Sequence, residues 1–196
     1  MKSLEPKKII LVGASTGGPS LIEKILASLE NNFDATLIIA QHMGADFIPS
    51  FLKRLTLKSN VPVSMAQEGI ALQNKKAYLT TAKSEVLYQN GHLLFSVKEF
   101  SHTDYNPSIN HLFSSCSKLP SSYRILCVLL TGIGDDGVDG CVELSQKGFA
   151  CIAQNKESSI VFGMPARAAE RVQNITMQSF DEILKTIIEF ARESPC

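Results

Sequence analysis

The chain has 196 residues, a length that suits one domain with a substantial hydrophobic core. Nineteen basic residues balance nineteen acidic ones, so the composition argues against binding to nucleic acid or to an anionic membrane surface. Hydrophobic residues make up 44% of the chain and charged residues 19%, which are values of an ordinary globular protein and argue against disorder.

The cysteines and the N-terminus indicate the compartment. The five cysteines are odd in number and contain no Cys-x-x-Cys pair, which disfavours a disulfide framework or a thiolate zinc site, and no His-x-x-x-His spacing occurs. Cys127 and Cys151 lie in apolar runs, where we expect them to act as small hydrophobic residues. The N-terminus lacks the apolar core of a signal peptide, and no apolar stretch approaches the roughly 20 residues that span a bilayer. We predict a soluble, cytoplasmic protein without a metal, a cofactor or a membrane-inserted segment.

The first informative stretch is an aliphatic run at residues 9–12 that leads directly into Gly13-x-Ser15-x-Gly17. An uninterrupted apolar run is typical of a strand buried on both faces of a parallel sheet. After Pro19, which suits a first helical turn, apolar residues recur at helical spacing. The sequence therefore predicts a strand, a tight turn and a helix, with Ser15 at the turn. This spacing is that of a nucleophile elbow, in which a serine hydroxyl lies above the carboxyl end of a sheet.

A second strand, helix and strand follow. Residues 35–40 form another buried-strand run that ends at His42, and residues 47–55 have the apolar pattern of a helix. Residues 62–66 suit a short third strand. Strands that alternate with helices indicate parallel pairing through right-handed crossovers.

The segment from about residue 77 to 96 has a different pattern. Its short apolar runs are residues 77–80, 86–88 and 93–95. Asn90-Gly91 separates the last two runs, and this dipeptide is the strongest short signal for a β-hairpin. We therefore predict an antiparallel hairpin inserted into the parallel sheet or attached to it. A polar loop at 101–106 and a helix from about Pro107 follow.

The alternation of strand and helix then returns. Residues 125–130 are the most hydrophobic run in the chain and predict a central strand, which ends before Asp135 and Asp136. A helix to about residue 147 and a strand at 149–153 come next.

Ser179 and Glu182 have the spacing of a capping box, which predicts the start of a final helix. No repeat, linker or low-complexity tract interrupts the pattern. We predict an α/β, doubly wound fold with a mostly parallel sheet, helices on both faces and an antiparallel hairpin. Residues 1–196 would form a single domain, with its core at about 8–192.

Three predicted strands are followed by polar residues at the same edge of the sheet. Reactive groups in open α/β sheets collect past the carboxyl ends of the strands, where Ser15, His42 and the Asp135/Asp136 pair are expected. A serine hydroxyl needs a base to accept its proton, an imidazole can do so, and a carboxylate can orient that imidazole. The order Ser–His–Asp differs from the Ser–Asp–His order of common α/β-hydrolases, but such triads are defined by geometry.

The residues also allow a different interpretation, in which the loop at residues 13–18 cradles a phosphate in a nucleotide- or phospholigand-binding module. Against it, the dinucleotide fingerprint requires glycine where Ser15 stands and an acidic residue where the second strand ends in Gln41-His42. The lysine of a Walker loop is absent as well. His42 could equally serve as a local hydrogen-bonding residue.

The acidic residues near the third strand end have an alternative role too. Asp135, Asp136 and Asp139 could all be charges that favour a helix N-terminus.

Several blocks resemble the catalytic domain of the CheB family, the chemotaxis protein-glutamate methylesterases. The matching blocks are Gly13-Ala14-Ser15-Thr16-Gly17-Gly18-Pro19, Gln41-His42-Met43, Pro107-Ser108-Ile109-Asn110, Leu130-Thr131-Gly132-Ile133-Gly134-Asp135-Asp136-Gly137, Gln154-Asn155 and Phe162-Gly163-Met164-Pro165. They occur in family order over nearly the whole chain, and together they are highly specific.

The resemblance implies a role for five residues. Ser15 would be the nucleophile, His42 the general base and Asp136 the carboxylate that orients it, because Asp136 matches the Asp-Gly of the family block. Thr16 and the backbone N–H near Ile133 would surround the oxyanion. Ile133 is usually methionine in the family, but a backbone donor does not depend on the side chain.

The resemblance also implies the function. Family members hydrolyse γ-glutamyl methyl esters on the cytoplasmic helical bundle of chemoreceptors, which would be the protein partner, and release methanol; some also deamidate glutamines. Only about seven residues precede the first strand, so we expect no phosphorylation-receiver domain in this chain. The departures from the family pattern are Asn106 for arginine, Asn110 and Asn155 for aspartate, Glu85 for histidine, and a 80–83 turn without Pro-Gly.

Overall fold

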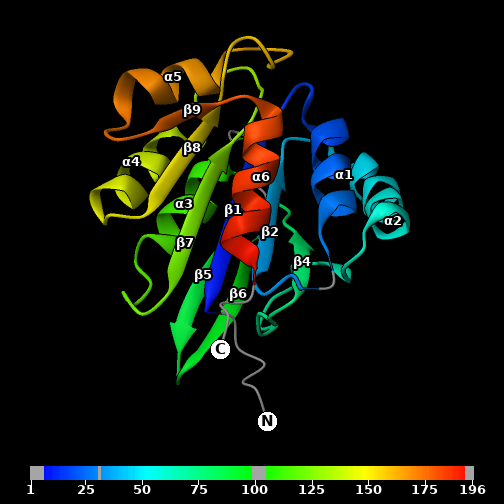
Figure 1. The fold of residues 1–196 in the computed structure, drawn as a ribbon. Coiled ribbons are helices and arrows are strands. Elements are labelled where there is room, and N and C mark those ends of the chain that lie inside the picture. Colours follow the sequence, from blue (N-terminus) through cyan, green and yellow to red (C-terminus); the bar gives the residue numbers. More distant parts are fainter. Residues whose placement is uncertain (1–6, 31, 99–104, 193–196) are drawn as a thin grey trace.

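The structure is a computed structural model, and it describes residues 7–30, 32–98 and 105–192. Seven strands form the main sheet: β1 (Lys8–Ala14), β2 (Thr36–Gln41), β3 (Val63–Met65), β4 (Lys76–Leu79), β7 (Arg124–Leu129), β8 (Ala150–Gln154) and β9 (Thr176–Gln178). Their order across the sheet is β3-β4-β2-β1-β7-β8-β9, and every neighbouring pair is parallel. β1 therefore lies in the middle, with the chain winding outward from it on both sides (Figure 1).

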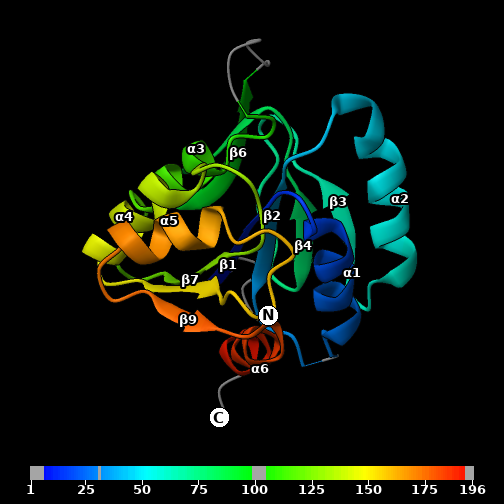
Figure 2. The same cartoon turned by 90° about the horizontal axis from the view of Figure 1, so that it is seen from above.

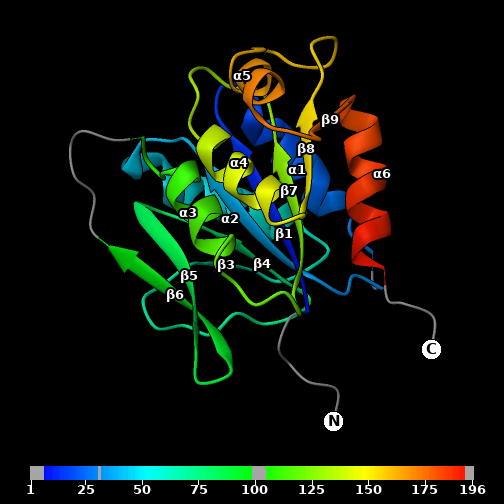
Figure 3. The same cartoon turned by 90° about the vertical axis from the view of Figure 1, so that its left-hand side faces the viewer.

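Helices cover both faces of this sheet, as Figures 1 and 3 show. One face carries α1 (Gly18–Ser28), α2 (Ile48–Lys58) with a preceding 3-10 turn η1 (Ala45–Phe47), and α6 (Phe180–Ala191). The other face carries α3 (Ile109–Cys116), α4 (Val138–Gln146) and α5 (Met164–Arg171). The predicted doubly wound α/β fold is confirmed.

The central strand β1 explains why its sequence is continuously apolar. Ile9 and Leu11 pack into the cluster with α3, α4 and α5, whereas Ile10 and Val12 pack into the cluster with α1, α2 and α6. Successive side chains of a strand point to opposite faces, and both faces are covered here, so each of these residues must be apolar. All four are fully buried.

The hairpin lies beside the main sheet as a separate two-stranded sheet of β5 (Lys83–Gln89) and β6 (His92–Lys98). Asn90 and Gly91 both have positive φ, as the predicted tight turn requires. The first of the three short runs is not part of the hairpin, because it forms β4 in the parallel sheet. Most of the predicted polar loop at 101–106 lies outside the described residues. The hairpin packs against α3, where Val86 and Phe95 share a core cluster with Leu112.

The cysteines Cys127 and Cys151 are buried in the core, as predicted. The Sγ atoms of Cys127 and Cys141 lie 3.2 Å apart. Cys127, Cys141 and Cys151 are all free thiols. Burial raises the pKa of Cys127 well above its ordinary value, so this thiol stays protonated at neutral pH.

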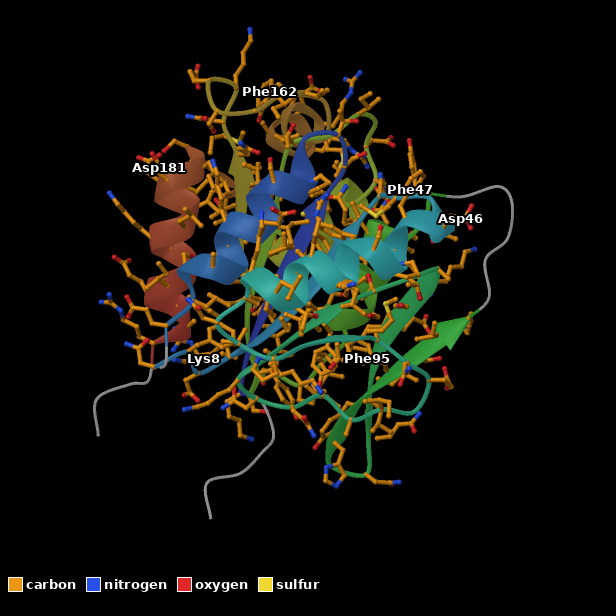
Figure 4. All side chains as sticks on the ribbon, turned by 90° about the vertical axis from the view of Figure 1, so that its right-hand side faces the viewer. Lys8, Asp46, Phe47, Phe95, Phe162 and Asp181 are labelled. Carbon is orange, nitrogen blue, oxygen red and sulfur yellow. The ribbon has the colours of Figure 1, made fainter. Side chains whose placement is uncertain are left out.

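The carboxyl ends of the parallel strands meet at one edge, which faces the viewer in Figure 2. In Figure 4, Phe162 lies at this end of the molecule and Lys8, at the start of β1, lies toward the opposite end. The chain leaves β1 toward one side and β7 toward the other, so the crevice for a ligand is expected between the ends of these two strands.

Candidate active site

Ser15 and His42 follow neighbouring strands at matched positions. Ala14, the last residue of β1, pairs in register with Gln41, the last residue of β2. The backbone N–H of His42 donates to the carbonyl of Ala14 at 2.9 Å, which extends the pairing by one step. Adjacent strands lie roughly 4.8 Å apart, so the two residues leave the sheet side by side.

His42 and Asp136 are in direct contact. The Nε2 atom of His42 lies 2.7 Å from Oδ2 of Asp136, with side-chain exposures of 11% and 2%. An ionised carboxylate only accepts hydrogen bonds, so the hydrogen of the neutral imidazole belongs on Nε2 in this arrangement. The lone pair of Nδ1 is then available to accept a proton.

The Asp136 carboxylate is held by two further donors, both from the first turn of α3. The N–H of Ile109 donates to Oδ2 at 2.7 Å, and the N–H of Asn110 donates to Oδ1 at 2.9 Å. A buried carboxylate requires such donors to offset its lost hydration. The N-terminus of a helix also favours a negative charge. Asp136 therefore caps the N-terminus of α3, although it is distant from α3 in the sequence.

Gln41 ties the two strand ends together. Its Nε2 donates to the carbonyl oxygens of Ser15 and His42, both at 2.9 Å, and the side chain is almost fully buried. Its Oε1 faces Gly18, where a Cβ would clash with it. The sequence analysis identified Gln41 as a mismatch to a nucleotide site and as part of a family block, but this bridging role was not predicted.

Tyr105 stacks on the His42 ring, which the sequence did not predict. The two rings are parallel to within 2°, with centroids 4.8 Å apart, and Tyr105 is 47% exposed. The segment after Tyr105 is held by a hydrogen bond from the N–H of Met43 to the carbonyl of Asn106 at 3.0 Å. One face of the imidazole is thus covered, so a substrate must approach from another side.

The loop after β7 packs against Ser15. The N–H of Ser15 donates to the carbonyl of Thr131 at 3.0 Å, and a Cβ at Gly132 would lie 2.6 Å from the Cβ of Ser15. Within the described residues, the N–H groups of Thr16 and Ile133 donate no hydrogen bond, and the Ser15 hydroxyl makes none. Backbone donors that have no acceptor in the free protein are available to bind an oxyanion.

Two acidic residues close to Asp136 in the sequence do not join the His42–Asp136 pair. Asp135 is exposed, and Asp139, in the first turn of α4, forms an ion pair with Arg171 at 2.5 Å. They match the alternative in which acidic residues only favour a helix N-terminus.

Two of the remaining histidines, His92 and His111, lie in the part of the chain that the structure describes. His111 forms an ion pair with Glu85 at 2.9 Å, His92 begins β6, and His102 lies outside the described residues. No group of three or more potential metal ligands gathers anywhere in the described ranges. None of the helices described is long and apolar enough to cross a bilayer.

The chain is similar to several known proteins. The family model described as CheB methylesterase matches residues 10–187. The protein-glutamate methylesterase/protein-glutamine glutaminase 2 of Carboxydothermus hydrogenoformans is 35% identical over 192 residues, which cover 95% of this chain and 54% of that protein. A protein of the same name from Methanospirillum hungatei JF-1 is 36% identical over 167 residues, which cover 82% of this chain and 46% of that protein.

A solved structure has the same fold. The crystal structure of the Thermotoga maritima CheB methylesterase catalytic domain matches with a TM-score of 0.83 and 29% identity, covering 93% of this chain and 97% of the other. The chain spans about half the length of the curated relatives it matches. Because sequence and structure point to the same relatives, the chain belongs to the CheB methylesterase family.

Proposed function

We propose that this protein is a cytoplasmic serine hydrolase that removes methyl groups from γ-glutamyl methyl esters of a protein and releases methanol. The substrate would be the cytoplasmic helical domain of chemoreceptors, in the adaptation step of bacterial chemotaxis. The observation that carries the proposal is the His42–Asp136 contact beside Ser15, in a chain of the CheB methylesterase family. Residues 8–192 would act as one catalytic domain.

In the first half of the reaction, Ser15 attacks the ester. A bond forms between its Oγ and the ester carbonyl carbon, while the hydroxyl proton moves to Nδ1 of His42. Asp136 stabilises the imidazolium through Nε2, at the 2.7 Å separation of the free protein. The bond to the methoxy oxygen then breaks, and His42 returns the proton to that oxygen to form methanol.

In the second half, water cleaves the acyl-serine. The water gives a proton to Nδ1 of His42 as its oxygen bonds to the acyl carbon. The bond to Oγ of Ser15 breaks, and the proton returns to the serine. The products are the γ-carboxylic acid of glutamate, which loses its proton to solvent at neutral pH, and the enzyme with its Ser15 hydroxyl restored.

The negative oxygen that develops in both halves needs donors that are not used elsewhere. The N–H groups of Thr16, which follows Ser15, and Ile133, which follows Gly132 in the loop packed on Ser15, are suited to this role because they have no other acceptor within the described ranges. Each such donor contributes about 3 kcal/mol to the stability of the transition state. A γ-glutamyl amide reaches the same acyl-serine with ammonia as the leaving group, so we include glutamine deamidation in the proposal.

A methanol-release assay on methylated receptor membranes tests the proposal. We expect Ser15→Ala to abolish release without altering the thermal melting curve. Ser20→Ala is the matched control, because Ser20 is exposed on the first turn of α1 and its hydroxyl donates a long hydrogen bond of 3.4 Å to the carbonyl of Gly17. Near-wild-type turnover by Ser15→Ala would reject the assignment. Tight nucleotide binding without serine labelling by a fluorophosphonate would favour the phospholigand module instead.

A further inference from the structure

Two helices begin at the same point, and each supplies an acceptor to the other. Asp136, just before α4, accepts the N–H groups of Ile109 and Asn110 in the first turn of α3. In return, the side-chain oxygen of Asn110 accepts the N–H groups of Gly137 at 2.9 Å and Gly140 at 3.1 Å, at the start of α4. Four helix-terminal donors are satisfied by this reciprocal pair of side chains.

We propose that Asn110 is a positioning residue for Asp136, and that its uncharged amide leaves Asp136 as the one anion in contact with His42 among the described residues. The proposal rests on the proposed function, in which His42 is the base. Asn110 would hold the backbone of Asp136 in place and, by lacking a charge, set the pH range in which His42 works.

The positioning argument follows from the peptide between Asp136 and Gly137. The Asn110 oxygen binds the N–H of that peptide, and this hydrogen bond fixes the backbone from which the Asp136 carboxylate extends. Gly137 has φ of 97°, and a Cβ there would lie 2.7 Å from side-chain atoms of Ile109 and Leu129. The turn therefore has little space in which to shift if the hydrogen bond is lost.

The helices themselves are in close contact at this point. A Cβ at Gly140 would clash with the Cβ of Phe113 and would lie 3.2 Å from the backbone oxygen of Asn110. No side chain separates α3 from α4 here, so the hydrogen bonds of Asn110 act across a fixed and short gap.

The charge argument depends on what surrounds the His42–Asp136 pair. A cavity of about 440 Å³ adjoins Asp136, and its lining includes charged or titratable residues from three elements and a loop: Lys83 on β5, His111 on α3, Asp139 and Glu143 on α4, and Tyr105. The nearby carboxylates have partners of their own, and Asp135 is exposed. Asp139 pairs with Arg171, Glu143 accepts from two serine hydroxyls, and Glu85 pairs with His111.

An aspartate at position 110 would keep the acceptor for Gly137 and Gly140 and would add one negative charge beside Asp136. That charge would stabilise the protonated imidazole of His42. We therefore expect Asn110→Asp to move the acid limb of the pH–rate profile to higher pH by about half a unit to one unit, the size expected for one charge several ångströms away. A role limited to structure would not move this limb.

The experiment uses two variants and one matched control. Asn110→Asp should shift the acid limb to higher pH, whereas Asn110→Leu, which has no acceptor, should lower kcat about tenfold or more at unchanged KM. Asn155→Asp is the control, because Asn155 also uses its oxygen to bind two donors, both on Ser158, and does not touch the pair. It should leave the acid limb where it is.

An NMR titration of the His42 ring in the same proteins separates this proposal from the methylesterase activity, since it needs no substrate. A midpoint that rises in Asn110→Asp and not in Asn155→Asp supports the proposal even if the substrate is another ester. Equal midpoints in wild type and Asn110→Asp, or a kcat of folded Asn110→Leu within twofold of wild type, would overturn it. If Asn110→Leu does not fold, the titration of Asn110→Asp decides.

Discussion

The N-terminus of α6 and the paired N-termini of α3 and α4 meet the same physical need in opposite ways. At α6, the hydroxyl of Ser179 accepts from the N–H of Glu182, and the carboxylate of Glu182 accepts from the N–H of Ser179 at 2.7 Å. This cap is local and largely exposed. At α3 and α4, Asp136 and Asn110 perform the reciprocal exchange across 26 positions of sequence, and the Asp136 carboxylate is buried.

The difference shows how the cap of a helix can also belong to the proposed active site. A local cap stabilises only its own helix, so it can be removed without effect elsewhere. The distant cap joins two helices, and its carboxylate has an oxygen that also contacts His42. Damage to this cap should therefore affect both stability and the proposed reaction.

The largest effect is expected from Asp136→Asn. The Asp136 carboxylate accepts hydrogen bonds from three donors: Nε2 of His42 and the N–H groups of Ile109 and Asn110. An amide has one acceptor oxygen, so its NH₂ group would face at least one of these donors and leave it unsatisfied. We expect kcat for methanol release to fall by about 10³- to 10⁴-fold. The same variant should lose about 1–3 kcal/mol of unfolding free energy, measured by urea denaturation, for the unsatisfied buried donor. Loss of activity without any loss of stability would contradict the joint role.

A smaller effect is expected from Gly140→Ala, which forces α3 and α4 apart. The new Cβ clashes with Phe113, and this overpacking should cost about 1–3 kcal/mol and lower kcat as Asp136 shifts. The matched control is Gly148→Ala just after α4, where φ is 81° and an added Cβ would meet nothing within 4 Å beyond its chain neighbours. The control should cost about 1 kcal/mol from the left-handed backbone and leave kcat unchanged. Equal kcat values for the two variants would remove the link between helix spacing and the site.

The local cap should behave differently. Ser179→Ala removes an N-cap hydroxyl and should lower the free energy of unfolding by about 1 kcal/mol, seen as a lower urea midpoint. Methanol release per folded molecule should not change. A loss of activity comparable to that of Gly140→Ala would mean that the two caps do not differ as proposed.

The smallest effect concerns the pH dependence of the same cap. Hydrogen bonds from the Ser179 hydroxyl and backbone lower the pKa of Glu182 below its ordinary value of 4.5. A carboxyl with a lowered pKa in the folded state stabilises the fold above pH 4.5, and this contribution is lost as pH falls through the folded-state pKa. Glu182→Gln should thus have a lower Tm than wild type at pH 7, with the gap narrowing at pH 3. A constant gap would show that the charge of Glu182 plays no part.

The fold and the approximate location of the site could be read from the sequence because both depend on local patterns. The aliphatic run at residues 9–12 predicts the strand β1, and the spacing of Ser179 and Glu182 predicts the start of α6. The glycines around Ser15 predict the turn after β1. The expectation that Ser15, His42 and Asp136 would gather at one sheet edge needed only strand order and direction.

Other features of the fold and the site could not be predicted, because no local sequence pattern indicates them. β9 has three partly exposed residues, and the buried side of α5 consists of Met164, Pro165 and Ala168, so neither has an apolar run to recognise. The stacking of Tyr105 on His42 and the use of Nε2 by Asp136 depend on how the segment before α3 lies across the strand ends. Such contacts between distant segments follow from the assembled fold.

The matched register of β1 and β2 has a consequence for how this site can change. Ser15 and His42 are each one residue beyond a backbone-paired position, so their separation is inherited from main-chain geometry that every amino acid shares. Substitutions around the rim can therefore alter which esters enter while the spacing of hydroxyl and imidazole persists. Insertion of one residue before Ser15 would do the reverse, since it would turn that side chain to the other face.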